Sequence, residues 1–260
     1  MFAVRTALVL AIGIVLSSSA LAGRSCEKSP TSTQAVEKSL NLALKAKTAL
    51  DASGANVVIL GRSGQDLSKY QLRYSHIGLA YKTSEGWRIL HKLNACGTSV
   101  SNMYVQGLGE FFLDDPWRYE AVWVVPNLDV QQKLQALLAD EAKAVAMHEP
   151  AYNIVSYAWG TKYQQSNQWA IETLALAMEP AIANRTQAQS WLKMKDYQPT
   201  ALTIRSMARL GGRATAANVA FDDHPNEKRF SDRIETVTAD SVFDWLQRAS
   251  LSASPMVITE

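Results

Sequence analysis

The chain has 260 residues, of which 47% are hydrophobic and 19% are charged. This composition is typical of a folded globular protein and excludes disordered, collagenous and coiled-coil proteins. The formal net charge is only +2 and no basic run is present, so nothing indicates a nucleic-acid partner.

Residues 1–22 are predicted to be a secretory signal peptide. Arg5 precedes an apolar stretch at residues 7–16, and the segment ends in Ala-Leu-Ala at Ala22, a pattern typical of cleavage sites. The apolar stretch is shorter than the roughly 20 residues that a membrane-spanning helix needs. We therefore expect a mature chain of residues 23–260, without a transmembrane anchor, in the periplasm or secreted.

The mature chain contains two cysteines, Cys26 and Cys96. In an oxidising compartment such a pair predicts a disulfide, which would tie the new N-terminus to the body of the protein. The alternative is that Cys96 is a nucleophile, but its Asn-Ala-Cys-Gly setting is typical of a turn. No zinc site of the cysteine type and no phosphate-binding loop is present, and we expect neither a metal nor a cofactor.

The predicted elements describe a single α+β domain. In chain order we predict a helix at 32–52, a strand at 57–60, a hairpin of strands at 74–82 and 87–93, an irregular segment at 97–118, a strand at 121–125 and a helix at 128–146. A short helix or turn around 151–158 precedes helices at 167–178, 186–194 and 200–210, a strand at 217–221, a charged loop at 222–232, a strand at 233–237, a helix at 240–249 and a loose tail at 250–260. Helices segregated from a mostly antiparallel sheet indicate the α+β class.

Two histidines lie on the predicted hairpin. A turn at residues 83–86 places His76 opposite Leu93 and His91 opposite Gly78. The two imidazoles are then diagonal neighbours on one face of the sheet, about 7–8 Å apart. One ring can take a proton while the other fixes its tautomer, or both can be buried strand histidines with a structural role. Gly78 leaves a gap beside His76 for a side chain or a substrate.

Ser166 lies where the helix at 167–178 is predicted to begin. Serine is a preferred N-cap residue, so a structural role is one interpretation. The other is a nucleophile, for which the N–H groups that open the helix at 166–168 would stabilise an oxyanion. An apolar cleft suited to an acyl chain or a sugar is expected around it. The residues expected to line this cleft are Trp159, Tyr163, Gln165 and Trp169.

These residues together resemble the circularly permuted papain-like fold, to which the NlpC-like hydrolases and lecithin retinol acyltransferase belong. In those families a His in a His-x-Gly context opens one strand and a second polar residue, often His, lies on the next. An Asn-Cys-x-x-aromatic segment then begins the helix that carries the cysteine nucleophile. His76 matches the first histidine, His91 matches the second polar residue, and Ser166 stands where the cysteine would be. The resemblance covers roughly residues 55–180.

Motifs along about the whole mature chain are also similar to a bacterial exported family called domain of unknown function 2145. They are Tyr74-Ser75-His76, Cys96-Gly97, Gln106-Gly107-Leu108, Phe111-Phe112, Ser166-Asn167-Gln168-Trp169 and Asp240-Ser241-Val242-Phe243-Asp244-Trp245-Leu246. This resemblance implies no particular activity. Residues 181–260 form an α+β extension beyond the papain-like core.

The papain-like resemblance implies an exported hydrolase or acyltransferase that acts on an amide or ester, in a cell-wall peptide or a lipid acyl group. Ser166 would be the nucleophile, His76 its base and His91 the orienting partner. A serine hydroxyl does not ionise near neutral pH as a cysteine thiol can, so it depends on a base within reach. The alternative is a non-catalytic binding or envelope-assembly domain on the same fold. A third possibility is a metal-dependent protein that uses the two histidines.

Overall fold

A computed structural model describes residues 31–114 and 116–260. The strands are β1 (Val57–Ser63), β2 (His76–Thr83), β3 (Gly86–Asn94), β4 (Ser101–Gly107), β5 (Arg118–Val124), β6 (Thr200–Thr203), β7 (Arg233–Thr236) and β8 (Met256–Thr259). The α-helices are α1 (Thr33–Ala52), α2 (Leu108–Leu113), α3 (Leu128–Leu138), α4 (Glu141–Ala144), α5 (Ser166–Met178), α6 (Arg185–Met194), α7 (Ser206–Thr215), α8 (Asn226–Phe230) and α9 (Ala239–Arg248).

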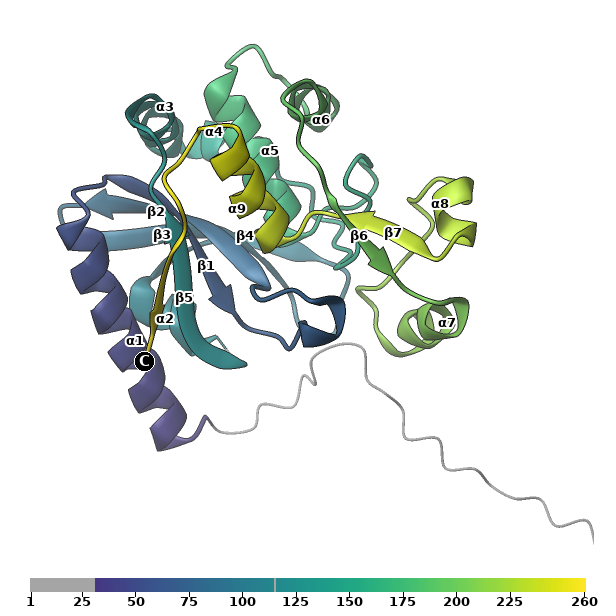
Figure 1. The fold of residues 1–260 in the computed structure, drawn as a ribbon, viewed down its shortest axis with the longest axis horizontal. Coiled ribbons are helices and arrows are strands. Elements are labelled where there is room, and N and C mark those ends of the chain that lie inside the picture. The colour runs from purple at the N-terminus through teal and green to yellow at the C-terminus, as the bar shows by residue number, and fades with distance from the viewer. Residues whose placement is uncertain (1–30, 115) are drawn as a thin grey trace, which may run out of the picture.

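The centre of the molecule is a six-stranded sheet in the order β4-β3-β2-β1-β5-β8 (Figure 1). Every neighbouring pair in it is antiparallel, which confirms the predicted α+β class. Strands β6 and β7 form a separate antiparallel pair, with α7 and α8 beside it.

Helices cover both faces of the main sheet. All seven residues of β1 are buried, because its side chains alternate between two cores. Val57 and Ile59 pack in the core that contains α3, α5 and α9. Val58 and Leu60 pack in the core that contains α1 and α2. The continuous apolar run at the start of β1 therefore reflects burial on two sides.

The β2–β3 hairpin has the predicted register. Leu79 pairs with Leu90 and Thr83 pairs with Gly86, where the turn closes. The expected gap at Gly78 is filled by side chains of the neighbouring strand. A Cβ atom at Gly78 would lie 2.5 Å from Cγ2 of Ile89 and 3.1 Å from Cβ of His91. Glycine at this position therefore allows the two strands to bring His91 close to β2.

Two segments that we expected to be irregular belong to the main sheet and its cover. Residues 97–118 contain β4 and α2, and the tail contains β8, which pairs with β5. Both strands lie at sheet edges, and many of their side chains are exposed. Because little of them is buried, their sequences lack the apolar alternation that identifies a strand.

The sequence also misplaced several element boundaries. The helix predicted at 128–146 is two helices, because Oδ1 of Asp140 accepts the N–H of Lys143 (3.1 Å) and begins α4. The segment predicted as a helix at 200–210 contains β6 and the start of α7. The predicted strand at 217–221 is absent from the described chain, and the charged loop at 222–232 contains α8. Short apolar runs of this kind do not distinguish strand from helix.

Some predictions concern residues outside the described ranges. The signal peptide at 1–22 and the pairing of Cys26 with Cys96 both depend on such residues, so they stay predictions. Within 31–114 and 116–260, no helix is both long enough and apolar enough to cross a membrane.

Candidate active site

Four polar side chains form a continuous hydrogen-bond chain at one end of the sheet. Oγ of Ser166 lies 3.1 Å from Nδ1 of His76, and Nε2 of His76 lies 2.9 Å from Nδ1 of His91. Nε2 of His91 lies 2.8 Å from Oε1 of Gln106. Ser166 is only 4% exposed, and both histidines are buried. The structure thus brings together the three residues that the sequence singled out and adds a fourth.

The sheet register positions the two histidines and the glutamine. His76 is the first residue of β2, and His91 follows Leu90 on the neighbouring β3. On β4, Tyr104 lies opposite His91, so Gln106 is its diagonal neighbour on the same face. Three strands therefore hold the three side chains in line.

Helix α5 brings Ser166 to this line from the other side of the sheet. Asn167, the second residue of the helix, binds the backbone at the start of β2 through both ends of its amide. Its Oδ1 accepts the N–H of Ile77 (3.0 Å), and its Nδ2 donates to the carbonyl of Ser75 (3.2 Å). These two bonds fix the first turn of α5 beside His76.

The start of α5 places Ser166 in the first turn of the helix and not at the N-cap. The N-cap is Gln165, whose Oε1 accepts the N–H of Asn167 (2.9 Å), and Ser166 is the first helical residue. The side-chain amide of Gln165 also donates to the carbonyl of Val237. The N–H of Asn167, one of the groups expected to stabilise an oxyanion, is thus already bonded within the protein.

Tyr152, which the sequence analysis did not single out, lies against Ser166. Burial raises the pKa of its phenol, and the polar groups of Ser166 beside it oppose this rise. Tyr152 thus places a phenol next to the serine hydroxyl.

The histidines lie in an apolar and positively charged environment. The ring of Phe111 has its centroid 5.9 Å from that of His76 and 5.3 Å from that of His91. The buried guanidinium of Arg62 lies 4.8 Å from the same Phe111 ring and forms an ion pair with Asp114. Burial, followed by the charge of Arg62, lowers the pKa of His76 well below 6.5 and that of His91 to about 4. Both rings are therefore neutral at pH 7.

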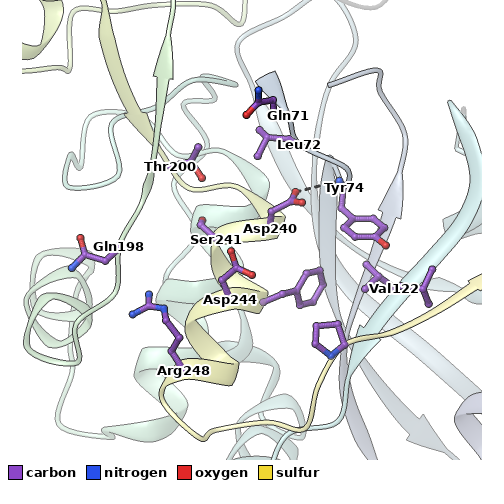
Figure 2. Close-up of a pocket in the computed structure, with 13 residues that line it drawn as sticks. Gln71, Leu72, Tyr74, Val122, Gln198, Thr200, Asp240, Ser241, Asp244 and Arg248 are labelled. Carbon is purple, nitrogen blue, oxygen red and sulfur yellow. Dashed lines mark hydrogen bonds between the residues drawn. The ribbon is translucent and has the colours of Figure 1, made fainter. Parts of the chain in front are cut away.

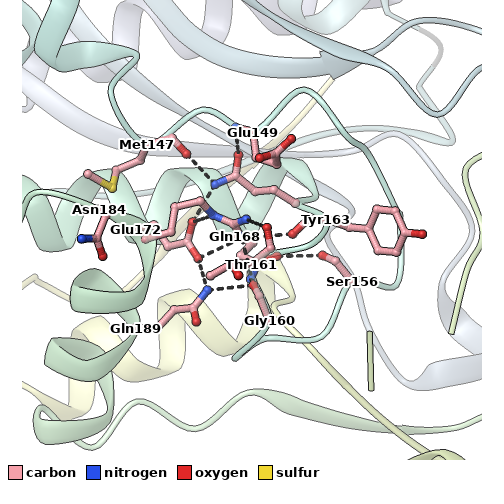
Figure 3. Close-up of polar contacts among 12 residues, drawn as sticks. Met147, Glu149, Ser156, Gly160, Thr161, Tyr163, Gln168, Glu172, Asn184 and Gln189 are labelled. Atoms are coloured by element: carbon pink, nitrogen blue, oxygen red, sulfur yellow. Dashed lines mark hydrogen bonds and ion pairs between the residues drawn. The ribbon is translucent and has the colours of Figure 1, made fainter. Parts of the chain in front are cut away.

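A buried carboxylate on α5 organises the segment that precedes Ser166. Oε2 of Glu172 accepts from Nε of Arg185 (2.7 Å) and from Nε2 of Gln164 (2.6 Å). Oε1 accepts from Nε2 of Gln189 (2.7 Å), as Figure 3 shows. A buried charge is costly unless it is paired, so these donors are needed to keep Glu172 inside the fold.

The cations of this cluster bind backbone carbonyls of the same segment. Arg185 donates to the carbonyl of Thr161 (2.8 Å), and Nζ of Lys92 donates to the carbonyl of Glu149 (2.5 Å). Burial is the main cause that lowers the pKa of Lys92 to about 7. The cluster thereby fixes the backbone on both sides of Tyr152, which explains how that phenol is held against the serine.

The residues expected to line a cleft have other surroundings. Trp169 is fully buried in the core, and the amide of Gln165 is used at the helix start. Trp159 is half-buried, with its ring centroid 5.9 Å from that of Tyr197, and Tyr163 is also half-buried. Two of the four expected cleft residues, Gln165 and Trp169, are therefore bonded or packed inside the fold, and the cleft itself stays a prediction.

A cavity of about 440 Å³ lies elsewhere, between the start of α9 and the segment before β2 (Figure 2). Tyr74 and Asp240 line it, and Ser166 does not. The carboxylate of Asp240 accepts the N–H groups of Arg73 (3.2 Å) and Tyr74 (3.3 Å). Helix α9 thus holds the backbone at Tyr74, two residues before His76.

An aspartate and a histidine form a buried pair within the segment predicted as a charged loop at 222–232. The side chains of Asp223 and His224 are buried, with Oδ1 of Asp223 3.0 Å from Nδ1 of His224. Oδ2 of Asp223 accepts the N–H of Tyr157 (2.7 Å). The pair holds the turns that precede α5. It is not part of the hydrogen-bond chain that contains Ser166.

Sequence reasoning missed Gln106, Tyr152, Arg62 and Asn167 as parts of the site. Gln106 and Asn167 were noticed only as letters of family motifs, without a role. Gln106 lies on a strand that was not predicted, so no register could place it beside His91. Tyr152 lies among turns, and no periodic pattern connects it to Ser166.

No group of three or more His, Cys, Asp or Glu side chains that could hold a metal ion occurs in the described part of the chain. Both ring nitrogens of His76 and both of His91 face hydrogen-bond partners. The arrangement is one continuous hydrogen-bond chain from Ser166 to Gln106.

Comparison with protein families decides where this chain belongs. Residues 49–246 match the model of a family described as "Uncharacterized protein conserved in bacteria (DUF2145)". The chain belongs to this family. The residues that match DUF2145 include all four members of the hydrogen-bond chain between Ser166 and Gln106. They also include Arg62 and Tyr152. Searches of curated proteins and of solved structures returned no match.

Proposed function

We propose that this DUF2145 protein is an exported hydrolase or acyltransferase with a permuted papain-like core. Ser166 would attack an amide or ester, with His76 as general base and His91 as its orienting partner. The observation that supports this most is the 3.1 Å distance from Oγ of Ser166 to Nδ1 of His76, with His91 2.9 Å behind it. A general base must lie within hydrogen-bond reach of the proton that it takes.

The proposed reaction has two stages. As Oγ of Ser166 bonds to the carbonyl carbon, its proton passes to Nδ1 of His76, and the carbonyl oxygen becomes an oxyanion. The amine or alcohol then leaves with the proton from His76, and an acyl-serine remains. Water or an acceptor hydroxyl resolves the acyl-serine, which separates a hydrolase from an acyltransferase. The Tyr152 phenol, which contacts Ser166, is the donor we assign to the oxyanion.

The order of the elements supports the papain-like part of the proposal. Antiparallel strands that carry His76 and His91 precede the helix that begins at Ser166. In the permuted arrangement the histidine strands likewise come before the nucleophile helix. The substrate class that this resemblance favours is a cell-wall peptide or a lipid acyl group.

One observation favours a second candidate, a non-catalytic binding or envelope-assembly domain. Ser166 is only 4% exposed, and Tyr152 lies against it. A substrate could reach Oγ only after side chains move. A site that had lost its activity would keep the same buried hydrogen bonds as part of the core.

Labelling with a fluorophosphonate distinguishes the two candidates, because this reagent reacts with activated serines. We expect covalent labelling of the wild type and its loss in Ser166→Ala. The matched control is Ser190→Ala, since Ser190 is an exposed helical serine whose hydroxyl donates only to the carbonyl of Thr186 (2.9 Å). This control should be labelled like the wild type. Absence of labelling in a folded wild-type protein would exclude an activated serine and favour the binding domain.

A further inference from the structure

We propose that Gln106 is a positioning residue that sets the direction of the hydrogen-bond chain, so that His76 presents a free lone pair to Ser166. This inference rests on the proposed function. It assigns a role to a side chain that is separated from the nucleophile by His91 and His76 along the series of hydrogen bonds, and that contacts only His91 within it.

The direction follows from what each atom can donate. An amide oxygen only accepts, so Oε1 of Gln106 requires a proton on Nε2 of His91. A neutral imidazole carries one proton, which leaves Nδ1 of His91 as an acceptor for Nε2–H of His76. Nδ1 of His76 is then unprotonated and accepts the hydroxyl proton of Ser166. Each of the three bonds has one donor and one acceptor.

This direction of the hydrogen bonds requires both rings to be neutral, because an imidazolium donates from both nitrogens. Burial and the nearby charge of Arg62 keep the pKa of both histidines below 6.5. The hydrogen bond with Gln106 acts on the pKa of His91 in the opposite direction and raises it, as an acceptor does. The neutral, single-proton state is thus the state near pH 7.

The opposite orientation of the Gln106 amide would reverse the direction of all three hydrogen bonds and leave His76 unable to act as a base. If the amide nitrogen of Gln106 faced His91, Nε2 of His91 would have to accept. Nδ1–H of His91 would then donate to His76, and Nδ1–H of His76 would donate to Ser166. His76 would have no lone pair for the serine proton. A carboxylate can only accept at this position, whereas glutamine can do both, so its orientation decides whether the base is available.

The site allows this residue to be changed without removing a core side chain. Gln106 is half-buried near the end of the edge strand β4. Three variants of similar length separate its functions: Gln106→Glu accepts only, Gln106→Lys donates only, and Gln106→Met does neither. Circular dichroism and thermal unfolding first establish that each variant is folded. The hydrogen-bond chain is examined after that.

The direct measurement is ¹⁵N NMR of the histidine side chains, which shows which ring nitrogens carry protons. Resonances are assigned with His148→Gln and His224→Gln, because these two histidines lie outside the chain. We expect the wild type and Gln106→Glu to carry protons on Nε2 of both His76 and His91. Gln106→Lys should move both protons to Nδ1, and Gln106→Met should show a mixture. A proton on Nδ1 of His76 in the wild type, or wild-type tautomers in both Gln106→Lys and Gln106→Met, would overturn the inference.

Fluorophosphonate labelling connects the tautomers to reactivity. In that reaction the Oγ–phosphorus bond forms, the serine proton passes to Nδ1 of His76, and fluoride leaves with the electrons of the phosphorus–fluorine bond. We expect Gln106→Lys to be labelled about 100-fold more slowly than the wild type, the lower range of general-base effects. Gln106→Glu should react at least as fast as the wild type. Expected tautomers in an unlabelled wild type would refute the proposed function and leave the role of Gln106 in the chain intact.

Discussion

At Ser166 the surroundings suit a hydroxyl better than the thiol found in papain-like enzymes. A reactive cysteine needs a thiolate, which an adjacent imidazolium stabilises. Here burial and Arg62 lower the pKa of His76, so an imidazolium is disfavoured in the resting protein. A serine and a neutral histidine form no ion pair before reaction. A serine at the position where the proposed papain-like core would have cysteine is thus consistent with the charge of the site.

The low pKa of His91 makes stability depend on pH. Its pKa is about 4 in the fold and 6.5 in the reference state, so the unfolded chain binds the proton first as the pH falls. Protonation of His91 therefore leaves the free energy of unfolding unchanged above pH 6.5 and lowers it progressively as the pH falls from 6.5 toward 4. Between pH 7 and pH 5 this single group should cost roughly 2 kcal/mol.

Urea unfolding of the wild type and of His91→Gln at these two pH values measures that contribution. We expect the wild type to lose more stability than the variant as the pH falls, because the variant lacks the titrating ring. Equal losses in the two proteins would show that His91 is not held neutral by the fold.

At the scale of elements, the hairpin could be predicted because its two strands and the turn between them are each identified by residues that are close in the sequence. The turn at 83–86 fixed the register, and the register placed His76 and His91 on one face, as the structure has them. Ser166 was placed at a helix start because the apolar pattern of α5 begins there. The contact between Ser166 and His76 joins residues 90 positions apart in the sequence. It depends on packing that no local pattern encodes.

The elements that could not be predicted are those that bury little. Strand β4 was missed because many of its side chains are exposed, and with it the partner of His91. Strand β8 was missed for the same reason. A helix cap was one interpretation of Ser166, based on residue preference, whereas the side chain of Gln165 forms the cap by accepting the N–H of Asn167. Hydrophobic periodicity identifies neither an exposed edge strand nor a cap formed by a side-chain hydrogen bond.

The close approach of β2 and β3 gives a prediction at this scale. Gly78→Ala should destabilise the protein by about 1–3 kcal/mol, the usual cost of overpacking, because the new methyl group would meet Ile89 and His91. Gly211→Ala is the matched control. It lies in α7 with nothing within 4 Å of its Cβ position, and it should be neutral or up to about 1 kcal/mol stabilising.

Thermal or urea unfolding of the two variants makes the comparison. A Gly78→Ala protein as stable as the wild type would mean that the strands can separate at His91 without cost. Fluorophosphonate labelling of the same variant should also slow, since a displaced His91 no longer orients His76.

At the scale of the whole molecule, the region after residue 181 supports the site from both sides. The carbonyl of Val237 binds the amide of Gln165, beside the nucleophile, and Asp240 binds the backbone just before His76. Helix α9 packs in the same core as α5. The extension, for which the sequence suggested no chemistry, therefore holds the helix start and the histidine strand in place.

We propose that His76 takes the proton of Ser166, and a comparison of two labelling rates tests this role. The labelling rate of Ser166 by a fluorophosphonate is measured in the full chain for the wild type and for His76→Gln, with circular dichroism to establish folding. We predict that His76→Gln reacts at least about 100-fold more slowly, because glutamine cannot act as a base. Equal rates in two folded proteins would contradict the account.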